Sequence, residues 1–292
     1  MLGSLNFVTA DAEGAVRFVL DNGWTGTRQR PVEIELEDWR KQADTLSLDR
    51  EGFVLDRVIS GVSDYRDERQ LAELWMPAVK ETVLRATGGS WACLFAGPLL
   101  RFSERREEAF SSAVSAPARA VHSDLSGGFS FDQLPLQPAA ASAVREVRER
   151  IGDATPRNWR IFNIWQVLSP PPQDTGLALC MLSSVAERDV IDGQGYFASE
   201  EKSAEELLAS EDLPHQFDIS FFRPNPDQRW GWFSDMLPGE ALIFSAFDPR
   251  AGKRKARVPH GAIDIPSAPA HAVPRNSIEI RALVVFDDGD KA

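Results

Sequence analysis

The sequence predicts a mainly β fold of the jelly-roll or related barrel type, with a few flanking helices. After residue 90, short runs typical of strands follow one another at close spacing and are separated by Pro, Gly and Asp turns. Only two segments show clear helical periodicity. The length of 292 residues suits one domain of this kind, since all-β barrels and sandwiches of that size are normally single domains.

The first 90 residues mix short strand-like runs, at 5–9 and 32–36, with one helical segment. From 67 to 86, apolar residues recur at helical spacing among Glu and Lys, and a Thr-Gly-Gly sequence ends the pattern. Pro77 is expected to kink or divide this helix. No linker follows, so we predict a single domain over 1–292, with 1–90 as an N-terminal elaboration and 91–292 containing the jelly-roll core.

The remaining elements lie after residue 90. A second amphipathic helix is predicted over 139–151, with Val144, Val147 and Ile151 as its apolar residues and Gly152 at its end. The predicted strands are 91–95, 119–122, 159–168, 177–182, 218–222, 241–247 and 277–286.

Composition excludes several classes of partner. The formal net charge of −12 leaves no broad basic surface to neutralise a phosphate backbone, so we expect no nucleic-acid partner. Cys93 and Cys180 lie far apart and offer neither a disulfide framework nor a thiolate metal cage, which favours a reducing compartment. No run approaches the ~18 apolar residues of a membrane helix, and the N-terminus lacks the pattern of a secretory signal. We therefore expect a cytoplasmic protein with no membrane partner, and a homodimer is an open alternative to a monomer.

The four histidines, His122, His215, His260 and His271, point to a metal site. His122 and Asp124 stand two residues apart at the end of a strand-like run, so they can share one face. A second imidazole from a distant strand would complete a set of two histidines and one carboxylate, which suits non-haem Fe(II) oxygen chemistry. His260 is the preferred third ligand and His271 its main rival. Hydrogen-bonded strand or loop histidines without a metal are the alternative interpretation.

A polar row follows the second of these histidines. Arg275 comes 15 residues after His260 (275 − 260) and shares one face of a strand with Ser277. In the 2-oxoglutarate reaction class, the distal carboxylate of the cosubstrate needs a fixed cation, which a guanidinium provides through two hydrogen bonds. Glu279 and Arg281 continue the same face, so a solvated row with a Glu–Arg pair is the alternative.

Several short segments, in order along nearly the whole chain, resemble the CmcJ/AsaB/NvfI-like family of hydroxylases and desaturases. They are LSLDREGF (46–53), ATGG (86–89), HSD (122–124), NIW (163–165), LALC (177–180), FSDM (233–236), EALIF (240–244), VPH (258–260) and PRNSIEIR (274–281). Members look like iron- and 2-oxoglutarate-dependent oxygenases with a double-stranded β-helix, the cupin-like form of the jelly-roll. Several of them act in secondary metabolism.

The resemblance implies a function and a set of site residues. The expected activity is hydroxylation, desaturation or cyclisation of a small-molecule substrate by a dioxygenase that uses Fe(2+), 2-oxoglutarate and O2. The implied roles are Fe(2+) binding by His122, Asp124 and His260, and 2-oxoglutarate binding by Arg275 with Ser277, or by Arg281 as the alternative anchor. The implied substrate contacts are Asn163, Trp165 and Gln166, although a structural role as a core aromatic is the alternative for Trp165.

Five positions depart from the family pattern. Each lacks a charged or titratable group that relatives often carry: Gly97, Gln166, Met181, Gln228 and Ser245. The proposed metal ligands are all retained, so the substrate and partner contacts of relatives transfer less readily than their metal chemistry. A catalytically silent jelly-roll binding or accessory subunit of a biosynthetic enzyme is therefore the alternative function. A metal-dependent enzyme that uses no 2-oxoglutarate is a third.

Overall fold

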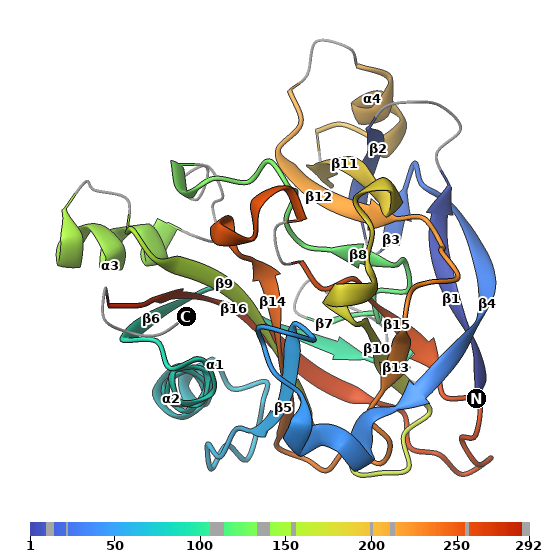
Figure 1. Cartoon of the computed structure of the whole chain (residues 1–292), viewed down its shortest axis with the longest axis horizontal. Coiled ribbons are helices and arrows are strands. Elements are labelled where there is room, and N and C mark those ends of the chain that lie inside the picture. The colour runs from blue at the N-terminus through green and yellow to red at the C-terminus, as the bar shows by residue number, and fades with distance from the viewer. Residues whose placement is uncertain are drawn as a thin grey trace.

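Two β-sheets form most of the molecule, with helices at their margins (Figure 1). The computed structural model describes residues 1–9, 15–21, 23–105, 114–132, 141–152, 156–198, 201–210, 214–254 and 257–287. The larger sheet contains β1 (Leu2–Thr9), β2 (Val16–Asp21), β3 (Gly23–Thr25), β4 (Arg28–Asp38), β8 (His122–Ser123), β10 (Thr175–Cys180), β11 (Val190–Phe197), β12 (Phe217–Phe222), β13 (Trp230–Trp232) and β15 (His260–Asp264). The smaller contains β5 (Phe53–Arg57), β6 (Trp91–Phe102), β7 (Val114–Ser115), β9 (Trp159–Val167), β14 (Glu240–Phe247) and β16 (Asn276–Val285).

Strand order shows how distant parts of the chain meet. The ten-stranded sheet runs β1-β4-β13-β10-β15-β8-β12-β11-β2-β3, and the six-stranded sheet runs β5-β14-β9-β16-β6-β7. Residues of β9 and β14 pack against residues of β10 in one apolar cluster, which joins the two sheets; among its members are Trp165, Leu179 and Phe244. The predicted mainly β jelly-roll with flanking helices is confirmed.

The six-stranded sheet buries apolar side chains on both faces. On one face of β16, Ile280 and Val284 pack against Val79 of helix α2 (Met76–Thr87). On the other face, Leu283 belongs to a second cluster that also contains residues of α3 (Ala141–Ile151). Side chains of a strand alternate between faces, so a strand covered on both sides is apolar almost throughout. The exception is the polar row at the beginning of β16, which faces the larger sheet.

The helix predicted over 67–86 is present but divided. It consists of α1 (Glu68–Gln70), a π-helical turn (Leu71–Trp75) and α2, which carries Pro77 in its first turn. Proline has no N–H to donate, and the wider turn before it accommodates the missing bond. Gly88 ends α2 in the left-handed conformation (φ 71°), as the Gly-Gly sequence predicted. The shorter helix α4 (Ala204–Ala209) was not predicted.

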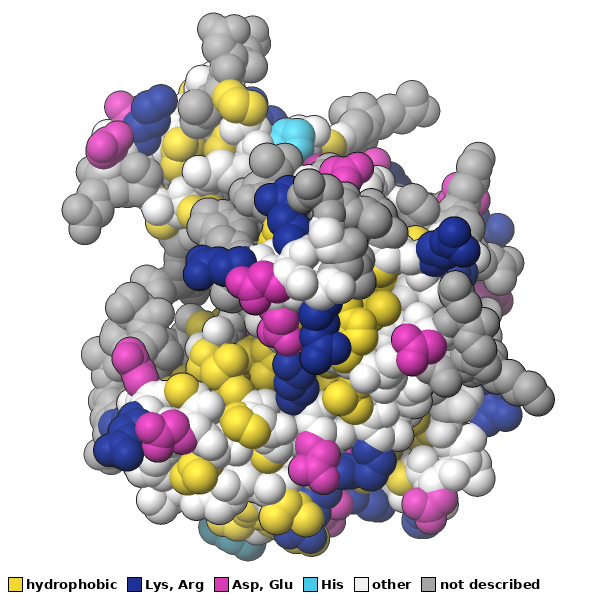
Figure 2. All heavy atoms as spheres, turned by 90° about the vertical axis from the view of Figure 1, so that its left-hand side faces the viewer, with side chains coloured by type: hydrophobic (Ala, Val, Ile, Leu, Met, Phe, Trp, Pro, Cys, Tyr) yellow, Lys and Arg dark blue, Asp and Glu magenta, His cyan; other side chains and the backbone are white. Residues whose placement is uncertain are grey.

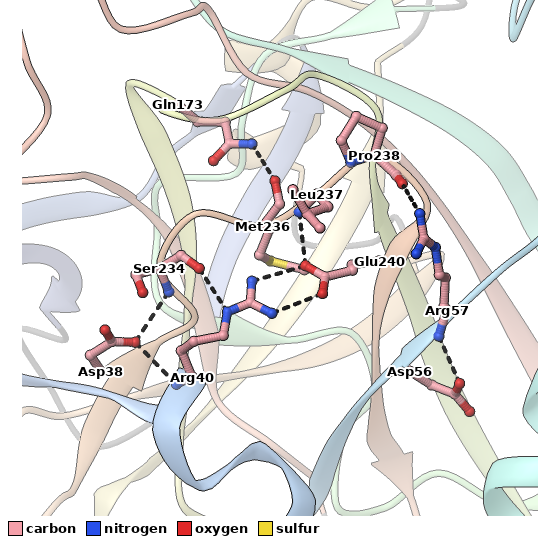
Figure 3. A network of polar contacts seen from close by, with 10 residues as sticks. All are labelled: Asp38, Arg40, Asp56, Arg57, Gln173, Ser234, Met236, Leu237, Pro238 and Glu240. Atoms are coloured by element: carbon pink, nitrogen blue, oxygen red, sulfur yellow. Dashed lines mark hydrogen bonds and ion pairs between the residues drawn. The ribbon is translucent and has the colours of Figure 1, made fainter.

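A polar network fastens the N-terminal segment to the jelly-roll (Figure 3). Arg40 lies in the 3-10 segment after β4, and its Nη1 and Nη2 donate to the carboxylate of Glu240 at 2.8 and 2.9 Å. Its Nε donates to the Ser234 carbonyl at 2.9 Å, and the Asp38 carboxylate accepts from the backbone N–H groups of Arg40 and Ser234. Residues near 40 therefore hold the turn that connects β13 to β14.

Replacing Arg40 by alanine is expected to lower the free energy of unfolding by about 2 kcal/mol, since a charge-assisted bidentate pair is lost and Glu240 keeps its negative charge. Urea denaturation measures the change. Arg69→Ala is the matched control, because its ion pair with Glu73 joins two exposed side chains (80% and 60%) and contributes at most about 0.5 kcal/mol. Equal losses in the two variants would contradict a structural role for the Arg40 network.

Both cysteines are buried, and neither forms a disulfide. Burial, followed by the charge of Glu146, raises the pKa of Cys93 to about 12. Burial also raises the pKa of Cys180 to about 12. The folded protein therefore keeps both protons at a pH where the unfolded chain loses them.

Two consequences are expected for the thiols. Iodoacetamide, which reacts with the thiolate, should modify neither cysteine of the native protein at pH 8 but both in guanidinium chloride, as mass spectrometry would show. The free energy of unfolding should fall as pH rises above about 8.5, the pKa of an unperturbed thiol, because the unfolded state then binds fewer protons than the folded one. Rapid native alkylation would contradict the described burial.

On one side of the molecule, the surface charges of the described residues are mixed in sign. Figure 2 shows the side of the molecule that is turned to the left in Figure 1, where basic and acidic side chains are interspersed and hydrophobic side chains gather near the middle. Such a face lacks the single-sign stripe that nucleic-acid binding requires. Among the described helices, none is both long and apolar enough to cross a bilayer.

Candidate metal centre

Strand pairing brings two of the four histidines together. β8 lies between β12 and β15, and His122 of β8 stands opposite His260 of β15 in the antiparallel register. Directly opposed residues project to the same face of a sheet, which explains why their ring centroids lie 4.4 Å apart. Both side chains are buried, at 3% and 7% exposure.

The two imidazoles are oriented in the same way. Nδ1 of His122 lies 2.7 Å from the carbonyl oxygen of Ala120, and Nδ1 of His260 lies 3.0 Å from that of Val258. In each case the carbonyl belongs to the residue two positions earlier, so Nδ1 carries the proton and donates it. Nε2 is then the unprotonated nitrogen of each ring and is available as a metal ligand.

Asp124 completes the group. Its Oδ1 lies 3.7 Å from Nε2 of His122, and its Oδ2 lies 3.7 Å from Nε2 of His260. The ligand atoms of the three residues all lie within 4.8 Å of one another. His122, Asp124 and His260 form the one such group of metal-ligating side chains within the described ranges. We call these three residues the donor cluster.

Two further side chains hold the carboxylate. Nη2 of Arg281 lies 2.5 Å from Oδ1 of Asp124, and Nδ2 of Asn163 donates to Oδ2 at 2.6 Å. Burial would raise the pKa of Asp124, but Arg281, the two histidines and Asn163 outweigh it and hold the pKa well below its usual range. Burial, together with the neighbouring His260, lowers the pKa of His122 to about 3. The cluster therefore presents one carboxylate and a neutral imidazole at neutral pH.

Arg275 lies beside the donor cluster and is 1% exposed. It lines a pocket together with all three donors and Trp165, and its guanidinium carbon lies 5.3 Å from the centre of the Trp165 ring. Its Nε and Nη2 have no hydrogen-bond partner among the described residues. Burial, followed by the charge of Arg101, lowers the pKa of Arg275 to about 10, so it stays charged at neutral pH.

The other three residues of the polar row, Ser277, Glu279 and Arg281, have different partners. Ser277 is fully buried, and its hydroxyl donates to the Arg101 carbonyl at 3.3 Å. Glu279 accepts from Nε of Arg101 at 2.8 Å, and Arg281 binds Asp124. The row is thus buried or paired rather than a solvated face.

Side chains of the segment around Asn163 point to the two opposite faces of β9. Asn163 and Trp165 share the inward face of β9, and both line a small pocket at the donor cluster. Gln166 lies on the other face, where its Oε1 accepts from Trp75 Nε1 at 2.6 Å and its Nε2 donates to the Tyr65 hydroxyl at 3.1 Å. The structure therefore places Gln166 under the helix layer, apart from the donor cluster.

The other two histidines lie elsewhere. Nε2 of His215 lies 3.0 Å from Asp218 on a partly exposed surface. His271 is exposed in a turn and does not belong to the donor cluster. Three neighbours of the site are given no site role by the sequence: Trp24, whose ring lies 4.8 Å from that of His122, Phe244, whose ring lies 4.9 Å from that of His260, and Arg101, which lines the pocket of the donor cluster.

Known proteins resemble this chain in sequence. Residues 5–285 match the family model described as "Oxidoreductase/YMDC permease-like domain". Hydroxylase/desaturase asaB of Aspergillus flavus is 33% identical over 131 residues, which are 44% of this chain and 56% of that protein. The Fe(II)/2-oxoglutarate-dependent dioxygenase nvfI of Aspergillus novofumigatus is 26% identical over 261 residues, or 87% of this chain and 83% of that protein.

A solved structure extends the likeness to the whole fold. The iron and alpha-ketoglutarate-dependent endoperoxidase NvfI matches with a TM-score of 0.72 at 21% identity, covering 98% of each chain. Fold and sequence comparisons thus point to the same relatives that the sequence segments resemble. The chain belongs to the oxidoreductase/YMDC permease-like family, and its predicted kinship with the CmcJ/AsaB/NvfI-like hydroxylases and desaturases is confirmed.

Proposed function

We propose that this chain is an Fe(II)- and 2-oxoglutarate-dependent oxygenase that hydroxylates, desaturates or cyclises a small molecule in secondary metabolism. The main support for the proposal is that the donor cluster and the buried guanidinium of Arg275 line the same pocket. Relatives named as hydroxylases, desaturases and dioxygenases support it.

The donor cluster fits Fe(II). Two imidazoles and one carboxylate form the set typical of non-haem iron oxygenases, and three protein ligands leave open positions on the ion. Two features of the arrangement favour a metal: both Nε2 atoms face the carboxylate, and the Nδ1 atoms donate to backbone carbonyls. We therefore assign His122, Asp124 and His260 as the metal ligands.

Arg275 is our choice for the group that binds 2-oxoglutarate. A buried guanidinium without a carboxylate partner is costly, and a dicarboxylate cosubstrate would supply the missing charge. Among the described residues, no carboxylate lies within ion-pair distance of the Arg275 side chain, whereas Arg281 is already paired with Asp124. Trp165, stacked against Arg275, fixes the direction of the guanidinium. Ser277 lies next to this anchor but donates to the backbone, so we assign it a supporting position.

Each residue has a defined part in the reaction. When bound, Fe(II), 2-oxoglutarate and O2 supply the oxidant for a substrate C–H bond, with release of succinate and carbon dioxide. His122 and His260 offer neutral nitrogen ligands, and Asp124 offers the negative charge. Arg281 and Asn163 hold the two oxygens of Asp124 in place, which orients the metal ligand. Asn163 and Trp165 are therefore positioning residues in this proposal.

Anaerobic addition of Fe(II) and 2-oxoglutarate tests the function. We expect the weak visible charge-transfer band of the chelate, followed by succinate formation when oxygen is admitted. His122→Ala should abolish both, while the matched control His271→Ala should keep both, since His271 is exposed and outside the donor cluster. Absence of band and succinate in the unmodified protein would reject the oxygenase and favour a silent binding or accessory subunit.

We also propose that 1–292 is a single domain with 1–90 as its N-terminal elaboration and that the protein is cytoplasmic, with a homodimer as the open alternative to a monomer. The first is supported by β1 and β4, which extend the sheet that contains the histidines, and by the Arg40–Glu240 pair. The two buried cysteines, neither of which forms a disulfide, support a reducing compartment. Light scattering distinguishes one 32.4 kDa chain from two.

A further inference from the structure

We propose that the substrate of this site is a bulky, uncharged and largely apolar molecule. The inference rests on the proposed function, because it concerns a cavity of about 880 Å³ whose lining includes His122, Asp124 and Arg281. Ligand pockets of ~300–1,000 Å³ enclose drug-sized molecules. This cavity is therefore far larger than an amino acid or another small acid needs.

Apolar side chains from both sheets form much of the cavity wall. They include Leu20, Trp24, Pro98, Phe197, Phe217 and Ile219. Leu20 and Phe197 are 39% and 47% exposed, which is unusual for large apolar side chains, and both lie on this cavity. The Phe197 ring is 4.6 Å from that of Phe217, so the two form a continuous aromatic surface. Exposed apolar side chains gathered in a hollow are typical of a site for an apolar ligand.

The charges in the cavity are already paired. Among the residues that the structure describes, the lining contains three arginines, and each has a carboxylate partner that also lines it: Arg101 with Glu279 at 2.8 Å, Arg119 with Glu104 at 2.6 Å, and Arg281 with Asp124 at 2.5 Å. A charged substrate group would leave water here without finding a free counter-charge, which is costly. A neutral substrate incurs no such cost.

Arg275 differs from these three arginines in its location and in its partners. Arg275 is absent from the lining of the large cavity and lies in the pocket that we assign to 2-oxoglutarate, without a carboxylate partner among the described residues. Among the described residues, the guanidinium without a carboxylate partner thus lies where an anion is expected, and three paired guanidinium groups lie where the substrate is expected. For polar groups on the substrate, the cavity offers the neutral side chains of Gln29 and Gln216.

A matched pair of fluorescent probes tests the inference: N-phenyl-1-naphthylamine, which is neutral, and 8-anilino-1-naphthalenesulfonate, which adds one negative charge to the same rings. We expect the neutral probe to bind the full-length protein at least about 10-fold more tightly. Phe197→Asp and Leu20→Asp should each weaken its binding about 5- to 10-fold. Ile59→Asp, at an 82% exposed apolar position outside the cavity, should change it less than about 2-fold.

The substitution Glu279→Gln is expected to strengthen binding of the charged probe. It removes the partner of Arg101, so binding of the sulfonate should improve about 5-fold while that of the neutral probe stays within about 2-fold. Equal or tighter binding of the sulfonate by the unmodified protein, or unchanged binding of the neutral probe by both cavity variants, would overturn the inference. These titrations need neither iron nor oxygen. Expected probe binding without a charge-transfer band would reject the proposed function alone, and the band without the expected probe binding would reject the inference alone.

Discussion

Asp124→Asn is expected to weaken Fe(II) binding by at least about 100-fold and to abolish succinate formation. Loss of an outer partner of a metal ligand already costs about 10–100-fold in affinity, and this change removes the only negative charge in the donor cluster. In the unmodified protein, Nη2 of Arg281 lies 2.5 Å from Oδ1 of Asp124. The substitution leaves this guanidinium without its counter-ion and close to a divalent cation. Equilibrium titration with Co(II), followed by visible absorption under nitrogen, measures metal binding independently of turnover.

The matched control for this variant is Asp264→Asn. Asp264 also pairs with an arginine, Arg119, at 2.9 Å, but its side chain is 80% exposed and does not belong to the donor cluster. We expect the Co(II) affinity of this variant to stay within about 2-fold of that of the unmodified protein, since an exposed ion pair contributes only ~1 kcal/mol or less. Metal affinity that falls equally in the two variants, or that survives in Asp124→Asn, would contradict the assignment of Asp124 as a ligand.

The residues of the donor cluster were predictable because of a local pattern. The spacing of His122 and Asp124 follows from strand alternation, and the scarcity of histidine left few partners to consider. What the sequence does not contain is the register that places His260 opposite His122. β15 itself was not predicted as a strand, since five residues that begin with His-Gly carry little strand character.

The role predicted for Arg281 depends on a distance that no pattern encodes, whereas the role predicted for Gln166 conflicts with strand alternation. Arg281 shares a face with Arg275, so the pattern allows either one as the anchor. In the structure Arg281 pairs with Asp124, which supports our proposal that Arg275 is the anchor. Gln166 follows Trp165 directly, and a neighbour in a strand points to the opposite face. Its amide therefore satisfies Trp75 and Tyr65 under the helix layer. Another departure from the family pattern, Gln228, similarly joins Asp189 to Trp230 by hydrogen bonds.

Most long strands of the fold were predicted, and the missed ones have physical reasons. β11 contains Gly193 and Gly195, a residue type depleted in strands. In the folded protein both glycines are required, because a Cβ on Gly195 would lie 2.3 Å from the Phe217 ring and one on Gly193 would lie 2.8 Å from Ile219. The sheet therefore uses glycine to let aromatic side chains lie against its backbone, a condition that only tertiary packing reveals.

Arg275→Gln is expected to raise the concentration of 2-oxoglutarate needed for half-maximal succinate formation by about 100-fold, with Co(II) affinity almost unchanged. Truncating one partner of a buried, hydrogen-bonded charge pair costs ~2–5 kcal/mol, which is about 30- to several thousand-fold in affinity. Arg275→Lys should recover little of this loss, because an ammonium cannot bind a carboxylate through two parallel bonds. Steady-state kinetics gives the requirement for cosubstrate, and metal titration gives the control.

Two comparisons make this prediction specific to the anchor. Arg281→Gln should change metal affinity more than it changes the 2-oxoglutarate requirement, because the Arg281 guanidinium contacts Asp124. If the 2-oxoglutarate requirement rose more in Arg281→Gln than in Arg275→Gln, Arg281 would be the anchor.

Stability gives the second comparison. Without ligands, Arg275→Gln should not lower the free energy of unfolding, since it removes a buried charge that lacks a carboxylate partner among the described residues. The unmodified protein bears that cost until cosubstrate binds, so 2-oxoglutarate with Co(II) should raise its melting temperature and leave that of Arg275→Gln nearly unchanged. A variant that lost stability without ligands would indicate that Arg275 serves the fold rather than the cosubstrate.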